Sequence, residues 1–540
     1  MAQPSNRVLA PAFAFAAALT LATASARADE PPPSPPPPSP PSTVAPAPDP
    51  YAAFPLIVPH EKHYIRAGLE IGGVLAVGLV DYMLSTTAAG GTTRPGDTRW
   101  GLRYDWSVLH EKLIGTGLDL DTNKIATNYV SHPLAGTLYY TAARSSHLSL
   151  AESYAYAVLG STTWEFFGEI REITSINDLI VTPVSGVSIG EPLMQLSGFF
   201  RRGKRRFGTE ALAFLLSPVK VVNELTDDAV PLPARLGPLG LPADPWHRFV
   251  LSAGVGATVQ TAEDHTHPRA TYVDERFSVD ARLANLPSYA GPGKHSRLFD
   301  EGNVSRVGLD LGFSRGNLVD AVFATSLVPV GYYYRDAEVD AGGSLRGHGM
   351  FVGLRMGFEY GGHDYDRDRA RPSDIVTIAS PLGVATEYSW TRGDVTIRSS
   401  LDLSGAISSV TPYAFSTYQR NNSLDDVLTP VRAQGYYHAF AVTAAPTVEI
   451  NIGGLRSRTS LRLDSFRAIE GHDENEPLVA HGPRFSDRRS LLRSTLSFVP
   501  PGTVLRVALD AQHASRAGSV GAVEEERSES SAWGSVGVEF

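Results

Sequence analysis

The second half of the chain alternates between apolar and polar residues with a period of two. In one stretch the apolar positions are Met350, Val352, Leu354, Met356, Phe358 and Tyr360, and the residues between them are Phe351, Arg355, Glu359 and two glycines. Successive side chains of a β-strand point to opposite faces of the sheet, so this pattern predicts strands with one face in an apolar medium and the other among charges. Charges of both signs recur on the polar face, which favours a barrel with a hydrated interior over a soluble β-sandwich.

Candidate strands follow one another from residue 246 to the end of the chain. They lie near 247–260, 271–284, 303–314, 317–331, 348–361, 382–391, 394–407, 410–420, 435–451, 455–469, 487–499 and 503–513, with a last one at 530–540. Bacterial single-chain barrels have an even number of strands, so one candidate must be false or two must merge. We therefore predict an antiparallel transmembrane β-barrel of about twelve strands over 246–540, with ten or fourteen strands as the alternatives.

The last strand and the aromatic residues indicate the outer membrane of a Gram-negative bacterium. Val536, Val538 and Phe540 share one face of the terminal strand, which resembles the C-terminal signal read by the outer-membrane assembly machinery. Tyrosines cluster at 332–334 and 436–437, as they do in the interface girdles of membrane barrels. The expected partners are therefore outer-membrane lipid and, through Phe540, the assembly machinery.

The N-terminal residues predict an export signal followed by a spacer. Residues 1–28 combine Arg7, an apolar run and the sequence Ala26-Arg27-Ala28, which predicts a signal peptide for the Sec route, cleaved after Ala28. Residues 29–60 are rich in proline. Such a segment cannot bury enough apolar surface to fold, so we expect a disordered, extended linker.

Residues 61–225 have the period of helices rather than strands. We expect helices near 67–84, 134–144, 149–172, 189–201 and 210–223, and Ser149 with Glu152 three residues later forms a capping pattern. Residues 226–245 contain five prolines, which stop regular structure and mark a joint before the barrel. The chain is thus predicted to be of the α+β class, with an N-terminal helical module and a C-terminal barrel.

Composition narrows the partners and the chemistry. The formal net charge of -10 argues against a nucleic-acid partner, because such a partner requires a basic face. The chain has no cysteine, which excludes disulfides, thiolate metal sites, cysteine nucleophiles and a lipoprotein anchor. No sequence pattern requires a cofactor. Stable membrane attachment is therefore expected to come from the fold itself.

An ordered series of polar and glycine positions in the helical module resembles a known family. The series is His132-Pro133, Gly136, Tyr139-Tyr140, Ala143-Arg144, Ser153, Gly160-Ser161, Trp164-Glu165, Gly168-Glu169, Ser175, Asp178-Leu179, Thr182-Pro183, Gly186 and Gly190-Glu191. It is similar to an uncharacterised bacterial family, a domain of unknown function in outer-membrane-type proteins of Gram-negative bacteria. The resemblance covers roughly residues 100–225. It implies a helical block that an ordinary porin lacks, and it implies no activity.

Carboxylates near a histidine are the usual parts for acid–base chemistry or metal binding, and the helical module holds such a set. The candidates are His132, Ser161, Glu165, Glu169 and Asp178, with Arg144, Glu172, Thr182 and Glu191 as further members of a polar network. One hypothesis is a structural network, because buried charges must be paired. A second is an envelope lipid hydrolase with Ser161 as nucleophile, His132 as base and Glu165 orienting the base. A third is a divalent-metal site on Glu165, Glu169 and Asp178, with His132 as a further ligand.

For the whole chain, the sequence favours a protein of the cell envelope that is not an enzyme. It would be a plugged channel, or a protein that binds a lipid or a small solute. The helical module is expected in the periplasm or inside the barrel. The hydrolase is the opposing hypothesis, and it requires the Ser161 hydroxyl to lie within hydrogen-bond reach of the His132 ring.

Overall fold

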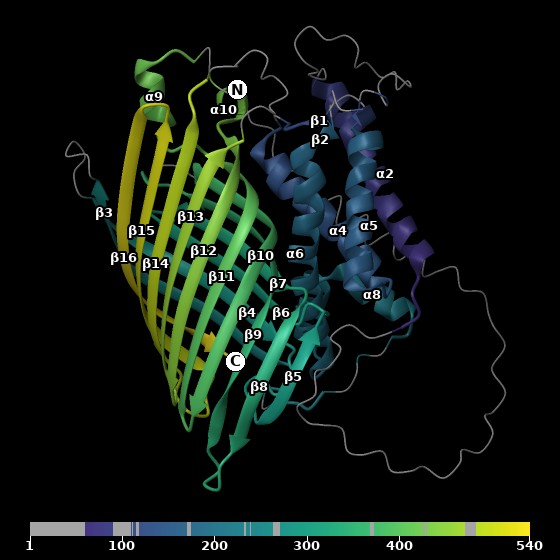
Figure 1. The fold of residues 1–540 in the computed structure, drawn as a ribbon, viewed down its shortest axis with the longest axis vertical. Coiled ribbons are helices and arrows are strands. Elements are labelled where there is room, and N and C mark those ends of the chain that lie inside the picture. The colour runs from purple at the N-terminus through teal and green to yellow at the C-terminus, as the bar shows by residue number, and fades with distance from the viewer. Residues whose placement is uncertain are drawn as a thin grey trace, which may run out of the picture.

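The computed structural model describes residues 60–89, 110, 112–114, 118–121, 123–169, 174–229, 231, 234–237, 239–262, 270–367, 372–424, 427, 429–469 and 482–540. The predicted signal peptide, 1–28, lies outside the described residues, as does the predicted linker, 29–60, except for His60. The first half of the described chain is helical and the second half forms a β-barrel (Figure 1).

The barrel is closed and antiparallel. Its strands are β3 (Trp246–Ala262), β4 (Thr271–Ala284), β6 (Val304–Ser314), β7 (Asn317–Val328), β9 (Leu345–His363), β10 (Asp374–Arg392), β11 (Val395–Val410), β12 (Tyr437–Ile452), β13 (Leu455–Ala468), β14 (Phe485–Phe498), β15 (Leu505–Val520) and β16 (Val523–Glu539). Each strand pairs with the next in this series, and β16 pairs with β3, which closes the ring. The predicted twelve-stranded barrel is confirmed.

Alternation along the strands places charges inside the barrel and apolar side chains outside. On β9, Arg355 and Glu359 line the interior. Met350, Val352 and Leu354 of the same strand are large apolar residues exposed on the outer face. The alternation in the sequence therefore reflects the barrel wall: every second side chain points into the polar interior, and the side chains between them point to the apolar exterior.

The structure corrects the predicted strands in several places. Two strands begin earlier than predicted, β10 at Asp374 instead of 382 and β16 at Val523 instead of 530. The candidate at 410–420 is not a strand, because β11 ends at Val410 and the helix α9 (Phe415–Asn421) follows. Its apolar residues fill the mouth of the barrel instead of adding to the wall. The prediction also missed β5 (Gly293–Phe299) and β8 (Gly331–Val339), which extend the sheet beyond the barrel wall from the first half of β9. The predicted strand 317–331 accordingly ends at Val328.

The helices of the first half are α2 (Tyr64–Ala89), α4 (His132–Ser145), α5 (Leu150–Thr163), α6 (Ile176–Arg202), α7 (Phe207–Leu216) and α8 (Pro218–Thr226). We call them together the helical module. The predicted capping box at Ser149 and Glu152 is present. The helix predicted near 189–201 begins earlier, at Ile176, because α6 is one helix of 27 residues that contains Pro183 and Pro192.

The helical module lies against the outer wall of the barrel (Figure 1). Val184 of α6 belongs to a buried apolar cluster with the outward-facing Phe358 of β9 and Ile407 of β11. Nearer the end of α6, Phe199 belongs to a second cluster with the outward-facing Phe249 of β3. The module was expected in the periplasm or inside the barrel; the second of these is wrong, because α6 packs on residues that point away from the lumen.

Helices α4 and α6 approach each other closely at two glycines. A Cβ on Gly136 would lie 1.9 Å from the backbone oxygen of Thr182, and one on Gly186 would lie 2.5 Å from the backbone oxygen of Gly136. Only residues without a side chain allow this spacing. The two helices thus form a tight pair, and α6 of this pair contacts the barrel.

Candidate functional site

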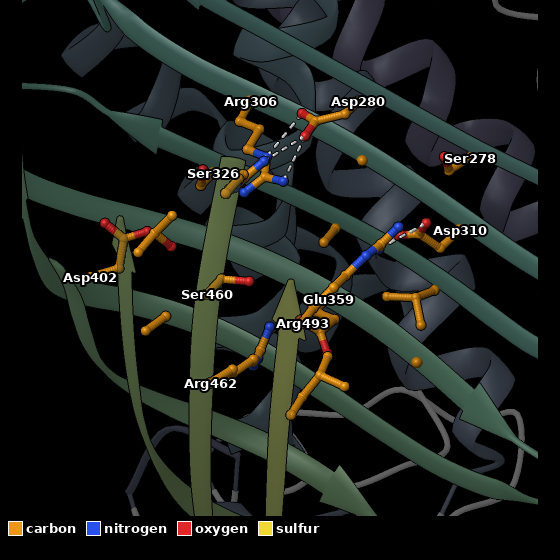
Figure 2. A pocket seen from close by; sticks show the side chains of 18 of the residues that line it. Ser278, Asp280, Arg306, Asp310, Ser326, Glu359, Asp402, Ser460, Arg462 and Arg493 are labelled. Atoms are coloured by element: carbon orange, nitrogen blue, oxygen red, sulfur yellow. Dashed lines mark hydrogen bonds and ion pairs between the residues drawn. The ribbon is translucent and has the colours of Figure 1, made fainter. Parts of the chain in front are cut away.

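The barrel encloses a cavity of about 490 Å³. Twelve arginines, ten carboxylates and His363 are among its lining residues, so its charges are almost balanced. In Figure 2, Arg306 is paired with Asp280, and Arg493 with Asp310. The volume is in the range of small-molecule sites, but the walls carry many more charges than such sites usually do.

Ion pairs cross this cavity between opposite walls. Arg458 of β13 reaches Asp280 of β4 with 3.3 Å between the Arg458 Nη1 and Asp280 Oδ2 atoms. Arg489 of β14 reaches Glu359 of β9 at 2.7 Å. Further pairs of this kind are Arg248–Glu449, Arg282–Glu387, Arg493–Asp310 and Arg516–Asp374. Side chains from non-adjacent strands therefore cross the lumen, and any solute that passed would have to separate them.

The connection between β11 and β12 fills one mouth of the barrel. We call residues 411–436, which include α9 and α10 (Thr429–Gln434), the first plug. Ala414, Val427 and Val431 of this plug are buried in one apolar cluster with the inward-facing Val376. The first plug also has polar anchors, since the backbone N–H of Tyr413 donates to the Asp487 carboxylate at 3.2 Å.

The first part of the connection between β4 and β6 fills the opposite mouth. We call residues 285–292, which lie between β4 and β5, the second plug. Leu286 and Tyr289 are buried in one apolar cluster with the inward-facing Phe351. The Tyr289 hydroxyl donates a hydrogen bond to Glu387 of β10. Burial raises the pKa of Tyr289, so the phenol stays protonated and keeps this bond.

Sequence reasoning missed both plugs, although it anticipated a plugged channel. Whether the helical module forms the plug was left open, and no other segment was considered for this part. The sequence does carry a signal for the first plug: apolar residues such as Val427 and Val431 continue beyond the end of β11, where a solvated loop would be polar. The luminal charges were visible as the polar face of the strands, but their pairing depends on how the barrel closes.

Inside the helical module, His132, Glu165 and Asp178 meet as one buried group. One ligand atom from each lies within 4.8 Å of the others. The His132 Nε2 atom lies 3.5 Å from an Asp178 carboxylate oxygen, and the backbone N–H of Ser175 donates to Glu165 at 3.0 Å. Two π-helical turns, Thr127–Ser131 and Trp164–Gly168, flank the group, and such turns are frequent at functional sites.

Glu169 lies near this group but has other partners. It accepts a hydrogen bond from the Trp164 ring N–H at 2.9 Å, and its backbone oxygen accepts one from Lys112 at 2.8 Å. The three residues that could hold a metal are His132, Glu165 and Asp178, and Glu169 is not among them. The metal hypothesis thus keeps Glu165 and Asp178 as ligand candidates. Glu172 lies outside the described residues.

Ser161 does not form the pair that a hydrolase requires. Its hydroxyl donates to the backbone oxygen of Asp178 at 3.1 Å, and the residue is 2% exposed. Within the described part of the chain, no hydrogen bond joins Ser161 to His132. The geometry therefore gives the hydrolase hypothesis no nucleophile–base pair.

The remaining candidates of the polar network hold elements together. Arg144 of α4 and Glu191 of α6 form a buried ion pair at 3.1 Å, and the Tyr140 hydroxyl donates to Glu191 at 2.7 Å. Arg144 also reaches Glu301, which follows β5, at 3.2 Å. Thr182 contributes its backbone to the contact with Gly136. These groups join α4 to α6 and the helical module to the barrel.

Comparison with known families agrees with the resemblance seen in the sequence. Residues 117–219 match the family described as "Domain of unknown function (DUF3943)". The matched range falls within the helical module and includes His132, Glu165 and Asp178. The description names no activity. No curated protein matches the chain in sequence.

Three solved structures illustrate the likeness of the barrel. The translocator domain of the autotransporter NalP from Neisseria meningitidis is 9% identical, with a TM-score of 0.20, and the match covers 55% of this chain and 90% of that one. The outer membrane channel DcaP of Acinetobacter baumannii is 10% identical, with a TM-score of 0.19 and coverage of 57% and 100%. The β-domain of the Bordetella autotransporter BrkA is 11% identical, with a TM-score of 0.19 and coverage of 53% and 98%. These TM-scores are low, so the barrel is established by its own strand pairing.

Proposed function

We propose that this protein is an outer-membrane channel, closed in the described conformation, that admits small charged solutes when a plug moves. The observation that carries this proposal is the charged cavity of about 490 Å³ inside the barrel, at each end of which a connection between strands is buried against inward-facing apolar residues of the wall. A barrel that served only as an anchor would gain little from this interior. The desolvation cost of buried ion pairs can exceed their Coulombic gain, so an apolar filling would be at least as stable.

The outer face of the barrel supports its place in a membrane. Large apolar side chains are exposed on it from most strands, including Val255, Val273, Leu354, Leu382, Leu403, Phe440, Val442, Leu463, Leu492, Leu509 and Val536. Soluble monomers rarely expose a continuous apolar surface of this extent. Bacterial membrane barrels present such a band to lipid.

The helical module fits the same bilayer. Two of the described helices are long and apolar enough to cross a membrane, over Tyr64–Leu84 and Ile176–Arg202. At about 1.5 Å per residue, α6 is long enough for a hydrocarbon core of about 30 Å. α2 exposes Ile65, Leu69 and Leu84. The module would thus stand beside the barrel in the lipid, with the barrel wall covering α6 and lipid covering α2.

We infer the orientation from the connections between strands. Both ends of the barrel have short turns, but the connections from β9 to β10, β11 to β12 and β13 to β14 are long and share one end, opposite the turns at 393–394, 453–454 and 499–504. Membrane barrels have their longer loops outside and their short turns in the periplasm. The first plug lies at the other end and would face the exterior. Phe540 lies at the periplasmic end, where its side chain packs beside Phe249 with ring centres 5.6 Å apart. Recognition of this last strand by the assembly machinery belongs to the same proposal.

Single-channel recording in planar bilayers tests the proposed function. Replacing Val431 and Phe485 by serine removes two apolar side chains from the cluster that holds the first plug. Each is worth about 2 kcal/mol of burial, so we expect the open probability to rise by more than about 10-fold. The control is Phe440→Ala, because Phe440 is 63% exposed on the outer face and contacts neither plug cluster. A doubly substituted protein that is folded, as shown by heat-modifiable mobility, and yet does not conduct would contradict the proposal.

A further inference from the structure

Three histidines meet where α2 begins and α4 ends. His60 and His63 precede α2, and His147 lies in the turn between α4 and α5. One ring nitrogen from each histidine lies within 4.8 Å of the others. The ring centres of His60 and His147 are 4.9 Å apart, and those of His63 and His147 are 5.9 Å apart. Residues separated by more than eighty positions in the sequence are thus brought to one place by the fold.

His147 is held so that one of its ring nitrogens stays available. Its Nε2 atom lies 2.7 Å from a carboxylate oxygen of Asp227, and Arg66 donates to the other oxygen of Asp227 at 2.7 Å. Its Nδ1 atom is buried and has no hydrogen-bond partner among the described residues, and the side chain is 3% exposed. A neutral imidazole that donates through one nitrogen carries a lone pair on the other, which is the arrangement found in histidine metal ligands backed by a carboxylate.

The backbone fixes His63 against this turn. The backbone N–H of His63 donates to the backbone oxygen of Ser146 at 3.0 Å. His147 itself has a φ of 65°, in the left-handed region where helix ends usually carry glycine or asparagine. A β-carbon in that region costs free energy, and the contacts of Ser146 and Asp227 hold the residue there nonetheless.

We propose that His60, His63 and His147 bind a divalent transition-metal ion, with zinc as the best fit, and that Asp227 orients His147 as a positioning residue. Imidazole nitrogens suit zinc, copper and nickel, and three protein ligands leave a fourth position for water. That position would be open to solvent, because His60 is exposed. Ligand nitrogens around zinc lie about 3.3 Å apart, so the group must tighten on binding, and the exposed His60 has the room to move.

Calorimetric titration of zinc chloride into the full chain in detergent micelles, without a polyhistidine tag, tests this site. We expect one site per chain. His60→Ala removes an exposed ligand with little risk to folding and should weaken zinc binding strongly. Asp227→Asn should weaken it by about 10- to 100-fold, which is the usual effect of losing the carboxylate behind a metal-bound histidine. His513→Ala alters an exposed histidine on the barrel and should leave the affinity unchanged.

The visible spectrum of bound cobalt reports the coordination geometry of the metal ion, and histidine variants show which residues bind it. Cobalt bound by three imidazoles and a water gives the intense visible absorption of a four-coordinate ion, and His63→Ala should abolish that spectrum. The proposal is overturned if the full chain binds no zinc, or if binding survives His60→Ala, His63→Ala and Asp227→Asn unchanged. It is also overturned if His132→Ala removes the bound ion while His63→Ala does not, because the ion would then occupy the buried group of His132, Glu165 and Asp178.

Discussion

Arg489 on β14 and Glu359 on β9 meet across the lumen, with 2.7 Å between the guanidinium and the carboxylate, although their strands stand on opposite walls. Arg462 of β13 also pairs with Glu359, and Asp464 pairs with both arginines. Four charges therefore tie one wall of the barrel to the other. This group forms only when the sheet closes into a barrel, because its members come from β9, β13 and β14.

Replacing Glu359 by glutamine should destabilise the barrel and change its ion selectivity. The substitution leaves two arginines with Asp464 alone, and removing one partner of a buried ion pair costs up to about 3 kcal/mol. The temperature of the heat-modifiable band shift should fall, and any residual current should become more anion-selective. Asp402→Asn is the matched control, because Asp402 is 39% exposed and pairs with Arg355 at the cavity edge. If Glu359→Gln and Asp402→Asn had equal effects, the ion pairs of Glu359 across the lumen would contribute no more to barrel stability and ion selectivity than the Asp402–Arg355 pair.

Replacing Gly136 by alanine should separate the stability of the helical module from that of the barrel. The new Cβ would lie 1.9 Å from the backbone oxygen of Thr182, so α4 and α6 must move apart. We expect a loss of about 3 kcal/mol or more in the helices, seen as earlier melting of the helical circular dichroism signal. Gly72→Ala on α2 meets nothing within 4 Å and should stabilise its helix by about 0.5 kcal/mol. If Gly136→Ala left the melting of the helical circular dichroism signal unchanged, the close packing of α4 on α6 would be contradicted.

Ser161 should resist a fluorophosphonate probe, which reacts with activated serines. Its hydroxyl is buried and donates to the backbone oxygen of Asp178 at 3.1 Å instead of to a histidine. Mass spectrometry of the labelled protein provides the measurement, with an active serine hydrolase as the positive control. Ser161→Ala should keep the fold at a cost of about 1 kcal/mol. Specific labelling that disappears in Ser161→Ala would restore the hydrolase hypothesis.

The exposed face of α2 should contact lipid. Because the chain has no cysteine, one can be introduced at Leu69 and spin-labelled without a background. Collision with oxygen, which concentrates in the bilayer, should match that of a label at Leu403 on the barrel belt. A label at Gly342, in the turn between β8 and β9, should collide instead with a water-soluble relaxation agent. If Leu69 behaves like Gly342, the helical module lies in water and its proposed place in the membrane is wrong.

The barrel was predictable from the sequence because its physical basis is local. Side chains alternate between the two faces of a strand. The sequence alone therefore predicts that Arg355 points inward and Leu354 outward, without knowledge of the neighbouring strands. The error at 410–420 has the same origin. Apolar residues at Val410, Ala414 and Phe415 are compatible with a strand, and only the tertiary structure shows that they fill a mouth.

The place of the helical module was not predictable in this way. Phe358 and Ile407 have the same apolar outward-facing position whether lipid or α6 covers them, so the strand pattern cannot distinguish the two. The candidate residues of the module were predictable as a set, since His132, Glu165 and Asp178 do meet. The group of His60, His63 and His147 was missed, because His147 lies more than eighty positions from the other two and only the fold brings it to them.

A disulfide that locks the first plug tests the proposed channel most directly. A Cβ on Gly518 of β15 would lie 2.8 Å from the Cβ of Tyr413 and 2.5 Å from a carboxylate oxygen of Asp487. Disulfides require about 3.8 Å between the Cβ atoms, so Tyr413→Cys with Gly518→Cys can bridge the plug and the wall once the backbone separates slightly and the Asp487 side chain turns away. Single-channel currents of this double variant should be absent when it is oxidised and should appear on reduction. Each single variant should conduct in both conditions. Equal currents before and after reduction of a verified disulfide would contradict the account, because the first plug would then not be a gate.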